Sequence, residues 1–214
     1  MRLVLPRLYV ILDSALLNIS VQDCAQELAD AGVRLLQYRD KIAPARQLLG
    51  SSRSLASLLI PLGVSFVVND RPDVAVMAGA SGVHVGQDDL DVEAARGIVG
   101  REKLIGVSTH NIEQFRAAAA TSADYIAVGP VFATSSKANP DPVIGTEFIR
   151  WVRDLSDKPI VAIGGIALEN AASVIQAGAD CVAVISDVLR AADRGRRAKQ
   201  YLDTLGAANH TATA

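Results

Sequence analysis

Cysteine is scarce in this sequence, and the placement of the few that occur excludes two classes of protein. Only Cys24 and Cys181 are present in 214 residues. They form no Cys-x-x-Cys pair and no metal-ligand spacing, so the sequence predicts neither a disulfide framework nor a cysteine-bound metal centre. Cys24 falls in a helical pattern and Cys181 at the start of an apolar strand, and a buried reduced thiol is the default interpretation of each. Two reduced thiols are therefore expected, which fits a reducing compartment.

An excess of one charge is also lacking. The sequence has 21 basic and 23 acidic residues, a formal net charge of −2. No strongly basic stripe is present, so we expect no nucleic-acid partner. No apolar run approaches the roughly 20 residues of a membrane helix. Pro6 and Arg7 interrupt the apolar start and no cleavage-site pattern follows, so we expect a cytoplasmic protein without a membrane partner.

Aromatic residues make up only 4% of the sequence, although hydrophobic residues make up 50%. The core must therefore consist mainly of Val, Ile, Leu and Ala. Branched aliphatic residues dominate buried parallel strands and the interior of (β/α)8 barrels. At 214 residues the chain is slightly shorter than the roughly 250 residues typical of that barrel. One compact domain with short loops is expected.

Apolar, strand-like segments alternate with Ala-rich amphipathic segments along the whole sequence. The predicted strands are 8–12, 33–38, 65–68, 82–85, 103–107, 125–128, 160–163 and 181–185. The predicted helices are 21–31, 45–60, 72–78, 92–99, 112–119, 146–155, 168–176 and 188–202. Such alternation implies parallel strands joined by βαβ crossovers. We predict an α/β fold, a single (β/α)8 TIM barrel with parallel strands at residues 1–206, and a disordered tail at 207–214.

Polar, charge-bearing residues follow several of these strands. Alternation in the second strand places Gln37 and Arg39 on the inward face near its carboxyl end, with Lys41 just beyond. Arginine and lysine at that position can hold a phosphate group. The alternative is a solvated Arg-Asp-Lys turn. The inward glutamine beside the inward arginine favours a ligand site, since active sites of this barrel lie at the carboxyl ends of its strands.

Two aspartates follow the next two strands. Asp70 comes after the third strand and Asp89 after the fourth, and adjacent strands lie about 4.8 Å apart. Both carboxylates could therefore reach one Mg²⁺, which usually takes one or two carboxylates and completes its shell with water and substrate phosphate. The alternative is that these residues and Asp88 only cap helices or form turns. That alternative is favoured for Asp88, and the metal is favoured for the other two.

A second anion site is predicted at the last two strands. Gly164 and Gly165 follow the seventh strand, and Ile185 and Ser186 end the eighth. In this barrel the loops after these strands commonly bind phosphate through backbone N–H groups, and glycine permits close approach of the backbone. A bare Gly-Gly pair could equally be an ordinary tight turn. Two anion sites together suggest two phosphorylated substrates.

The sequence offers no convincing acid–base pair. His84 alternates within a strand, and His110 follows Ser108 and Thr109. Isolated histidines at such places more often serve packing and hydrogen bonding than catalysis.

Taken together, these residues resemble the thiamine phosphate synthase family from Leu8 to about Leu202. The motifs that carry the resemblance are Gln37-Tyr38-Arg39-Asp40-Lys41, Asn69-Asp70-Arg71, His84-Val85-Gly86-Gln87-Asp88-Asp89, Gly106-Val107-Ser108-Thr109-His110, Gly129-Pro130-Val131-Phe132, Ile163-Gly164-Gly165-Ile166 with Asn170, and Val184-Ile185-Ser186. Jointly they are specific, although each alone fits several phosphate-binding barrels. The resemblance implies an enzyme that joins a hydroxymethylpyrimidine diphosphate to a thiazole phosphate, giving thiamine phosphate and pyrophosphate.

The resemblance also implies roles for individual residues. The pyrimidine diphosphate would be held by Gln37, Arg39, Lys41, Asn69, Ser108 and Lys137. The thiazole phosphate would be held by Thr134, Ser136, Gly165, Ile185 and Ser186. Mg²⁺ would be bound by Asp70 and Asp89. The neighbouring motif residues Tyr38, Asp40 and Ser135 are counted with the substrate-binding set, and Arg39, Lys41, Ser108 and Lys137 are predicted to be catalytic.

One departure from the family pattern is visible, and three alternatives remain. The family usually has Thr-x-Thr-Lys where this sequence has Thr134-Ser135-Ser136-Lys137, which keeps the hydroxyl and loses a methyl group. The alternatives are a thiazole tautomerase-like relative, a non-catalytic phosphate-binding barrel and a sugar-phosphate isomerase. The aspartate pair with Gln37 and Lys137 argues against the first two, and the lack of an acid–base pair argues against the third. The substrates are small molecules, and a homo-oligomer is left open.

Overall fold

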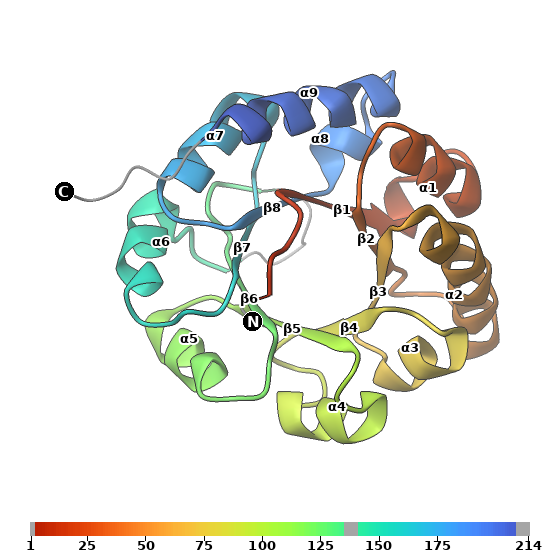
Figure 1. Ribbon diagram of the computed structural model, residues 1–214, viewed down its shortest axis with the longest axis horizontal. Coiled ribbons are helices and arrows are strands. Elements are labelled where there is room, and N and C mark those ends of the chain that lie inside the picture. Colours follow the sequence, from red (N-terminus) through yellow and green to blue (C-terminus); the bar gives the residue numbers. More distant parts are fainter. Residues whose placement is uncertain (1–2, 135–140, 209–214) are drawn as a thin grey trace.

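The protein is a closed barrel of eight parallel strands surrounded by helices, as the computed structural model shows (Figure 1). The structure describes residues 3–134 and 141–208. The strands are β1 (Leu8–Asp13), β2 (Leu35–Arg39), β3 (Ser65–Asn69), β4 (Gly82–Val85), β5 (Leu104–Thr109), β6 (Tyr125–Val128), β7 (Ile160–Ile163) and β8 (Cys181–Val184). Each pairs with the next along the sequence, and β8 pairs with β1. The predicted (β/α)8 barrel is confirmed.

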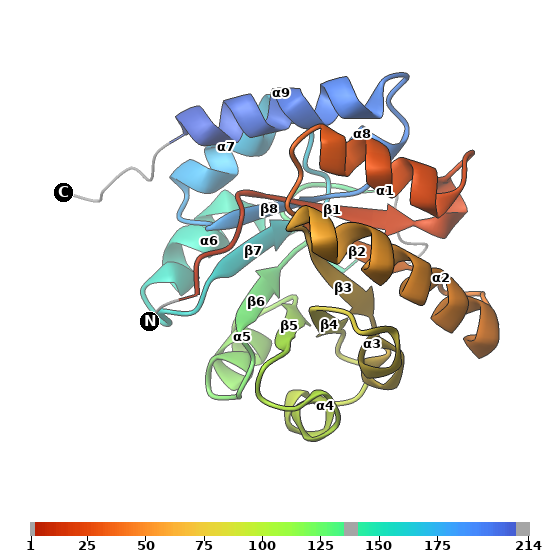
Figure 2. The ribbon, with the colours of Figure 1, turned by 45° about the vertical axis from the view of Figure 1, so that its right-hand side comes forward.

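The helices form the outer layer of the barrel, as Figure 2 shows from the side. They are α1 (Val21–Asp30), α2 (Ala45–Leu59), α3 (Pro72–Ala78), α4 (Val92–Val99), α5 (Ile112–Ala119), α6 (Gly145–Arg153), α7 (Leu168–Gln176), α8 (Ser186–Leu189) and α9 (Arg194–Ala207). Two short 3₁₀ helices occur at Ser14–Leu16 and Ile60–Leu62. Side chains of Ser20, Asp91 and Asn111 accept hydrogen bonds from the first turns of α1, α4 and α5, and thereby fix where these helices begin.

The final predicted helix, 188–202, is wrong in its extent. The structure divides this region into α8 and α9, separated by residues 190–193. The Asp193 side chain accepts a hydrogen bond from the Arg196 N–H and so starts a new helix. Val188 and Leu189 are buried and anchor α8 against the barrel. The last helix then continues to Ala207, and Ala208 is also buried, so the tail predicted at 207–214 does not begin at residue 207. Residues 209–214 of that predicted tail lie outside the described residues.

Two hydrophobic clusters result from strand alternation. The smaller one fills the barrel interior and includes Tyr9, Leu35, Tyr125 and Cys181. The larger one lies between the strands and the helices and includes Leu36, Tyr38 and Cys24, among many others. Leu35 and Leu36 therefore face opposite sides of β2, as period-two alternation requires. Both cysteines are buried and free, as predicted.

The segment before β1 crosses the amino end of the barrel (Figure 1). Leu5 is only 7% exposed and packs with the interior cluster, and Leu3 packs against the same cluster. This end is thus covered by the chain itself, and the carboxyl ends of the strands are left for chemistry. No helix within the described residues is long and apolar enough to cross a membrane.

Candidate active site

Charged side chains gather at the carboxyl ends of β1 to β4, and we call this group the charged half of the site. Arg39 ends β2, and its guanidinium forms an ion pair with Asp13 at the end of β1. Lys41 follows β2, and its ammonium forms an ion pair with Asp70. Asp13 is 6% exposed, so the Arg39 pair is largely shielded from water. Residues from three strands therefore meet at one rim, as the sequence predicted.

Asp70 and Asp89 lie close together within the charged half. Asp70 has φ +62°, a left-handed conformation that is uncommon for a residue other than glycine and is often found at functional sites. The Asp89 carboxylate accepts a hydrogen bond of 2.8 Å from the Gly86 N–H. Burial raises the pKa of Asp89, and the neighbouring Asp70 carboxylate raises it further. A carboxylate whose proton affinity is raised by burial and by a second carboxylate beside it forms a site that a cation would stabilise.

Four other residues predicted to bind substrate lie outside the two ion pairs of the charged half. Tyr38 is 3% exposed and packs in the outer cluster, away from the barrel interior, and its hydroxyl donates to Asp40. Asp40 also accepts hydrogen bonds from two backbone N–H groups of the turn after β2. Asn69 ends β3 and is half-buried. Gln37 is 2% exposed and lies inside the barrel, where its side-chain amide donates to the Tyr9 hydroxyl over 2.6 Å.

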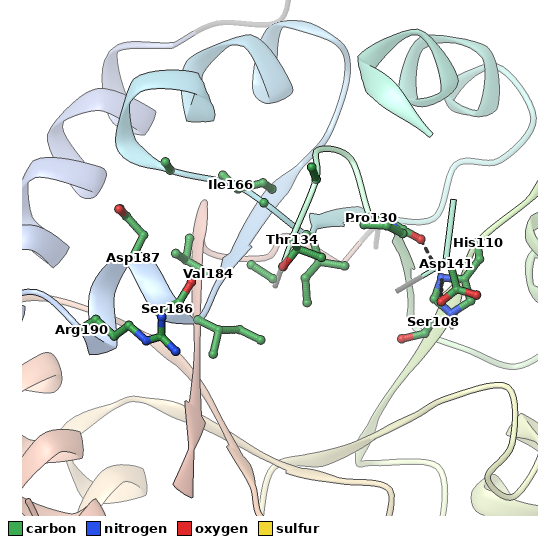
Figure 3. A pocket seen from close by; sticks show the side chains of 18 residues that line it. Ser108, His110, Pro130, Thr134, Asp141, Ile166, Val184, Ser186, Asp187 and Arg190 are labelled. Carbon is green, nitrogen blue, oxygen red and sulfur yellow. Dashed lines mark hydrogen bonds and ion pairs between the residues drawn. The ribbon is translucent and has the colours of Figure 1, made fainter. Parts of the chain in front are cut away.

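A cavity of about 340 Å³ lies at the carboxyl ends of β5 to β8, and we call this region the cavity half of the site (Figure 3). Five of the predicted site residues line it: Ser108, Thr134, Gly165, Ile185 and Ser186. Most of the lining residues belong to the ends of β7 and β8 and to the segments that follow β6, β7 and β8. This cavity is where the sequence predicted the second anion site.

Two glycines shape the wall of the cavity half. Gly164 has φ +97° and Gly165 has φ +65°, conformations that favour glycine. A Cβ atom on Gly165 would lie 2.3 Å from the Ala133 carbonyl oxygen, and one on Gly164 would lie 2.5 Å from Pro130. The loop after β7 therefore packs directly against the loop after β6. Only glycine allows that close approach. Gly164 and Gly165 are therefore needed for the packing of the two loops, whether or not their backbone groups also bind a ligand.

Several ionisable lining residues of the cavity half were not singled out from the sequence as ligand-binding residues. Arg190 lies just after α8 and directs its guanidinium towards the cavity beside Ser186 (Figure 3). The Nδ1 atom of His110 lies 2.6 Å from the Gly129 carbonyl oxygen and 3.5 Å from the Asp141 carboxylate. Because a carbonyl oxygen can only accept, Nδ1 of His110 carries a proton.

Asp187 also lines the cavity, on the same side as Arg190, but its carboxylate is engaged with other side chains (Figure 3). Its carboxylate accepts two hydrogen bonds from Arg197 and one of 2.6 Å from the Tyr201 hydroxyl. Within residues 3–134 and 141–208, by contrast, the Arg190 guanidinium makes no hydrogen bond or ion pair with another side chain. An exposed arginine beside a cavity, without a protein partner there, is available to an anionic ligand.

Three predicted site residues lie outside the described part of the chain. These are Ser135, Ser136 and Lys137. Among the described residues, no group of three or more His, Cys, Asp or Glu side chains is gathered to hold a metal ion. The pair Asp70 and Asp89 still fits Mg²⁺, which needs only one or two protein carboxylates when water and substrate phosphate complete its shell.

A closed barrel with a charged rim and an adjoining cavity of this kind defines a (β/α)8-barrel enzyme of the phosphate-binding class. The model of the family described as thiamine monophosphate synthase matches residues 8–188. The thiamine-phosphate synthase of Koribacter versatilis is 50% identical over 206 residues, which cover 94% of this chain and 96% of that protein. That of Myxococcus xanthus is 46% identical, over 89% of this chain and 88% of that protein. The chain therefore belongs to the thiamine monophosphate synthase family and is a transferase.

Solved structures agree with this assignment. The structure of thiamine phosphate pyrophosphorylase from Pyrococcus furiosus matches with a TM-score of 0.85 and 32% identity, over 94% of this chain and 96% of that chain. A 3-hexulose-6-phosphate synthase matches with a TM-score of 0.66 and 19% identity, which indicates a shared fold only. The tautomerase-like and non-catalytic alternatives are not favoured by these relatives.

Proposed function

We propose that the protein joins 4-amino-2-methyl-5-hydroxymethylpyrimidine diphosphate to thiazole phosphate and releases pyrophosphate and thiamine phosphate. The observation that carries this proposal is the pairing of a charged half and a cavity half at one rim, within a chain that is 50% identical to a thiamine-phosphate synthase. The reaction needs two phosphorylated substrates that face each other. A rim with two different anion sites meets that need.

The charged half is proposed to hold the pyrimidine diphosphate. Arg39 and Lys41 supply positive charge. Asn69 at the end of β3 and Ser108, which lines the adjoining cavity, would supply polar groups. Asp70 and Asp89 would bind Mg²⁺, which supplies charge neutralisation for the diphosphate when bound. The Lys41 ammonium already contacts Asp70, so in the complex it lies between the carboxylate pair and the anionic substrate. Lys137 is proposed for the same role on the basis of the sequence alone.

The cavity half is proposed to hold the thiazole phosphate. Backbone groups near Gly165 and Ser186, with the Thr134 hydroxyl, line the cavity that would receive it. Arg190 adds a guanidinium cation at the same wall. Guanidinium groups bind phosphate through paired N–H donors. We therefore include Arg190 among the residues that contact the thiazole phosphate.

The proposed chemistry is a dissociative substitution at the pyrimidine methylene carbon. The bond to the diphosphate breaks first, and the electron-rich aminopyrimidine stabilises the resulting cation. Arg39 and Lys41 stabilise the charge that grows on the departing diphosphate, which is electrostatic stabilisation of the transition state. The thiazole nitrogen then attacks with its own lone pair, so no general base is required. The enzyme mainly positions two substrates and excludes water.

The experiment that tests this proposal measures pyrophosphate release by the purified protein. Both substrates are supplied, then each alone, with and without Mg²⁺. Release that requires both substrates and Mg²⁺, with thiamine phosphate formed in equal amount, is the expected result. Well-folded protein that releases no pyrophosphate with both substrates and Mg²⁺ would refute the proposed activity.

A further inference from the structure

A continuous series of hydrogen bonds runs through the barrel interior and ends at the active site. We call it the interior network, and its members are Gln37, Tyr9, Tyr125, His84 and Ser108. Successive distances are 2.6 Å from Gln37 Nε2 to the Tyr9 hydroxyl, 3.2 Å between the two tyrosine hydroxyls, 3.1 Å to His84 Nδ1, and 2.9 Å from His84 Nε2 to Ser108 Oγ. It thus links β1, β2, β4, β5 and β6.

The network is shielded from water except at its last member. Gln37, Tyr9, Tyr125 and His84 are all less than 9% exposed. Ser108 is partly exposed and lines the cavity half of the site (Figure 3). The His84 ring also stacks on the Tyr125 ring, with centroids 5.6 Å apart and an interplanar angle of 26°. Packing therefore holds the imidazole in place, and the hydrogen bonds decide which of its nitrogens carries the proton.

The direction of the network follows from its buried end. The Gln37 amide nitrogen can only donate, so the Tyr9 oxygen accepts. The Tyr9 proton then has the Tyr125 oxygen as its partner, and the Tyr125 proton has His84 Nδ1. This leaves the proton of the imidazole on Nε2, which donates to Ser108 Oγ. The opposite direction would require the Gln37 carbonyl oxygen to face Tyr9.

The state of the imidazole agrees with this direction. Burial lowers the pKa of His84 to about 4, so the ring is neutral near pH 7 and has one donor and one acceptor nitrogen. Burial likewise keeps the pKa of Tyr9 and of Tyr125 above the ordinary value, so both hydroxyls retain their protons. Each neutral group in the interior can then donate one hydrogen bond and accept another.

We propose that the interior network makes His84 a positioning residue, which fixes Ser108 as a hydrogen-bond donor to an anionic oxygen of the bound diphosphate. Because Ser108 Oγ accepts from His84, its own proton is free to point into the site. Within the described residues, its hydroxyl has no other hydrogen-bond partner. A phosphate oxygen can only accept, so a hydroxyl held as a donor fits it, whereas one turned towards His84 would present lone pairs. This inference rests on the proposed function.

The direct test is ¹⁵N NMR of the histidine side chains in the wild-type protein at pH 7. His84→Gln identifies the signals of His84 by their loss. We expect a neutral ring protonated on Nε2. A ring protonated on Nδ1 would reverse the direction of the network and overturn the proposal. This measurement needs no turnover, so absence of catalysis would count against the proposed function alone.

A variant tests whether the network matters for the reaction. Tyr125→Phe keeps the ring and removes the hydroxyl that donates to His84 Nδ1. We expect a shift of the Nδ1 resonance and a fall of about fivefold in kcat, the effect of weakening one hydrogen bond. The KM for the pyrimidine diphosphate should change less than twofold, because Ser108 remains in place.

Tyr201→Phe is the matched control. It removes another buried tyrosine hydroxyl, one that donates to Asp187 outside the network. The His84 resonances should not move in this variant. If Tyr125→Phe leaves both kcat and the His84 spectrum at the wild-type values, the positioning role is refuted. A fall in kcat without a change at His84 would also refute it.

Discussion

The two halves of the active site are built from different materials. The charged half uses ionic side chains, such as Arg39, Lys41 and Asp89, at the ends of the early strands. The cavity half uses backbone, glycine and small hydroxyl groups at the ends of the later strands, with Arg190 at its wall. Charged side chains can follow a departing anion as its charge grows. A backbone wall instead has a fixed shape, which suits a substrate that must be held still.

Because of this difference, substitutions in the two halves should change different kinetic constants. Damage to the charged half should lower kcat, because that half acts on the leaving group. Damage to the cavity half should chiefly raise the KM for the thiazole phosphate, because that half positions the second substrate. The following predictions use this difference, from the largest expected effect to the smallest.

Asp89→Asn should have the largest effect. Asparagine can still accept the Gly86 N–H hydrogen bond but lacks the charge that would bind Mg²⁺. We expect the rate of pyrophosphate release to fall about 100-fold, equal to about 2.7 kcal/mol, and to respond weakly to added Mg²⁺. Asp91→Asn is the control, since asparagine also caps a helix and Asp91 only caps α4. Equal rates of pyrophosphate release for the two variants would show that the charge of Asp89 has no role in the reaction.

Gly165→Ala should distort the backbone that forms one wall of the cavity half. Alanine at φ +65° is strained by about 1–2 kcal/mol, and its Cβ would lie 2.3 Å from the Ala133 carbonyl oxygen. We expect kcat/KM for the thiazole phosphate to fall about 30-fold, about 2 kcal/mol. Gly79→Ala is the control, because Gly79 has φ +71° and open space around its Cβ position. Loss of thermal stability without loss of activity in both variants would contradict a direct role for this wall.

Arg190→Gln tests the one long cationic side chain assigned to the cavity half. Its guanidinium faces the cavity, so its loss should raise the KM for the thiazole phosphate about tenfold, about 1.4 kcal/mol. The kcat and the KM for the pyrimidine diphosphate should change little. Arg196→Gln removes a nearby exposed arginine that does not line this cavity, and should leave all three constants unchanged. Steady-state kinetics with each substrate varied in turn would separate these outcomes.

His84 lies beneath the junction of the two halves and should make stability depend on pH. Its pKa is about 4 in the folded protein, against an ordinary value of 6.5, so the unfolded chain takes up a proton first as the pH falls. The free energy of unfolding should therefore decrease between about pH 6.5 and 4, by at most about 1.4 kcal/mol per pH unit. Denaturant unfolding at several pH values measures this slope. His84→Gln should flatten the slope, whereas His110→Gln should retain the contribution of His84.

Sequence periodicity was sufficient for the fold because every unit repeats the same pattern. The strands Gly82–Val85, Tyr125–Val128 and Ile160–Ile163 begin and end where the pattern predicted. The last helix was not predictable in this way, since residues 188–202 remain compatible with one helix until Asp193 is seen to cap a new one. A capping side chain competes with helix continuation only through its local hydrogen bond. The spacing of apolar residues carries no information about that hydrogen bond, so it could not predict the break in the helix.

The position of candidate site residues was predictable where the residue type alone marks them. Arg39, Asp70 and Asp89 carry charges at strand ends, and the structure places all three at the rim, whereas their roles stay predictions. Arg190 is also charged, but it falls within the predicted helix 188–202, which contains several arginines. Only its direction towards the cavity distinguishes it from Arg196.

The sequence by itself determined the barrel, the family, the rim at which the charged residues gather and the two aspartates that fit a metal. These features depend on residue type and on spacing along the chain, which folding preserves. The tertiary structure decided how Gln37, Tyr9, Tyr125 and His84 meet inside the barrel and which cavity residues face one another. Those contacts join residues from separate strands, over separations of up to 116 positions. Side-chain alternation places each of them inside, but only closure of the barrel brings their polar atoms within hydrogen-bonding distance.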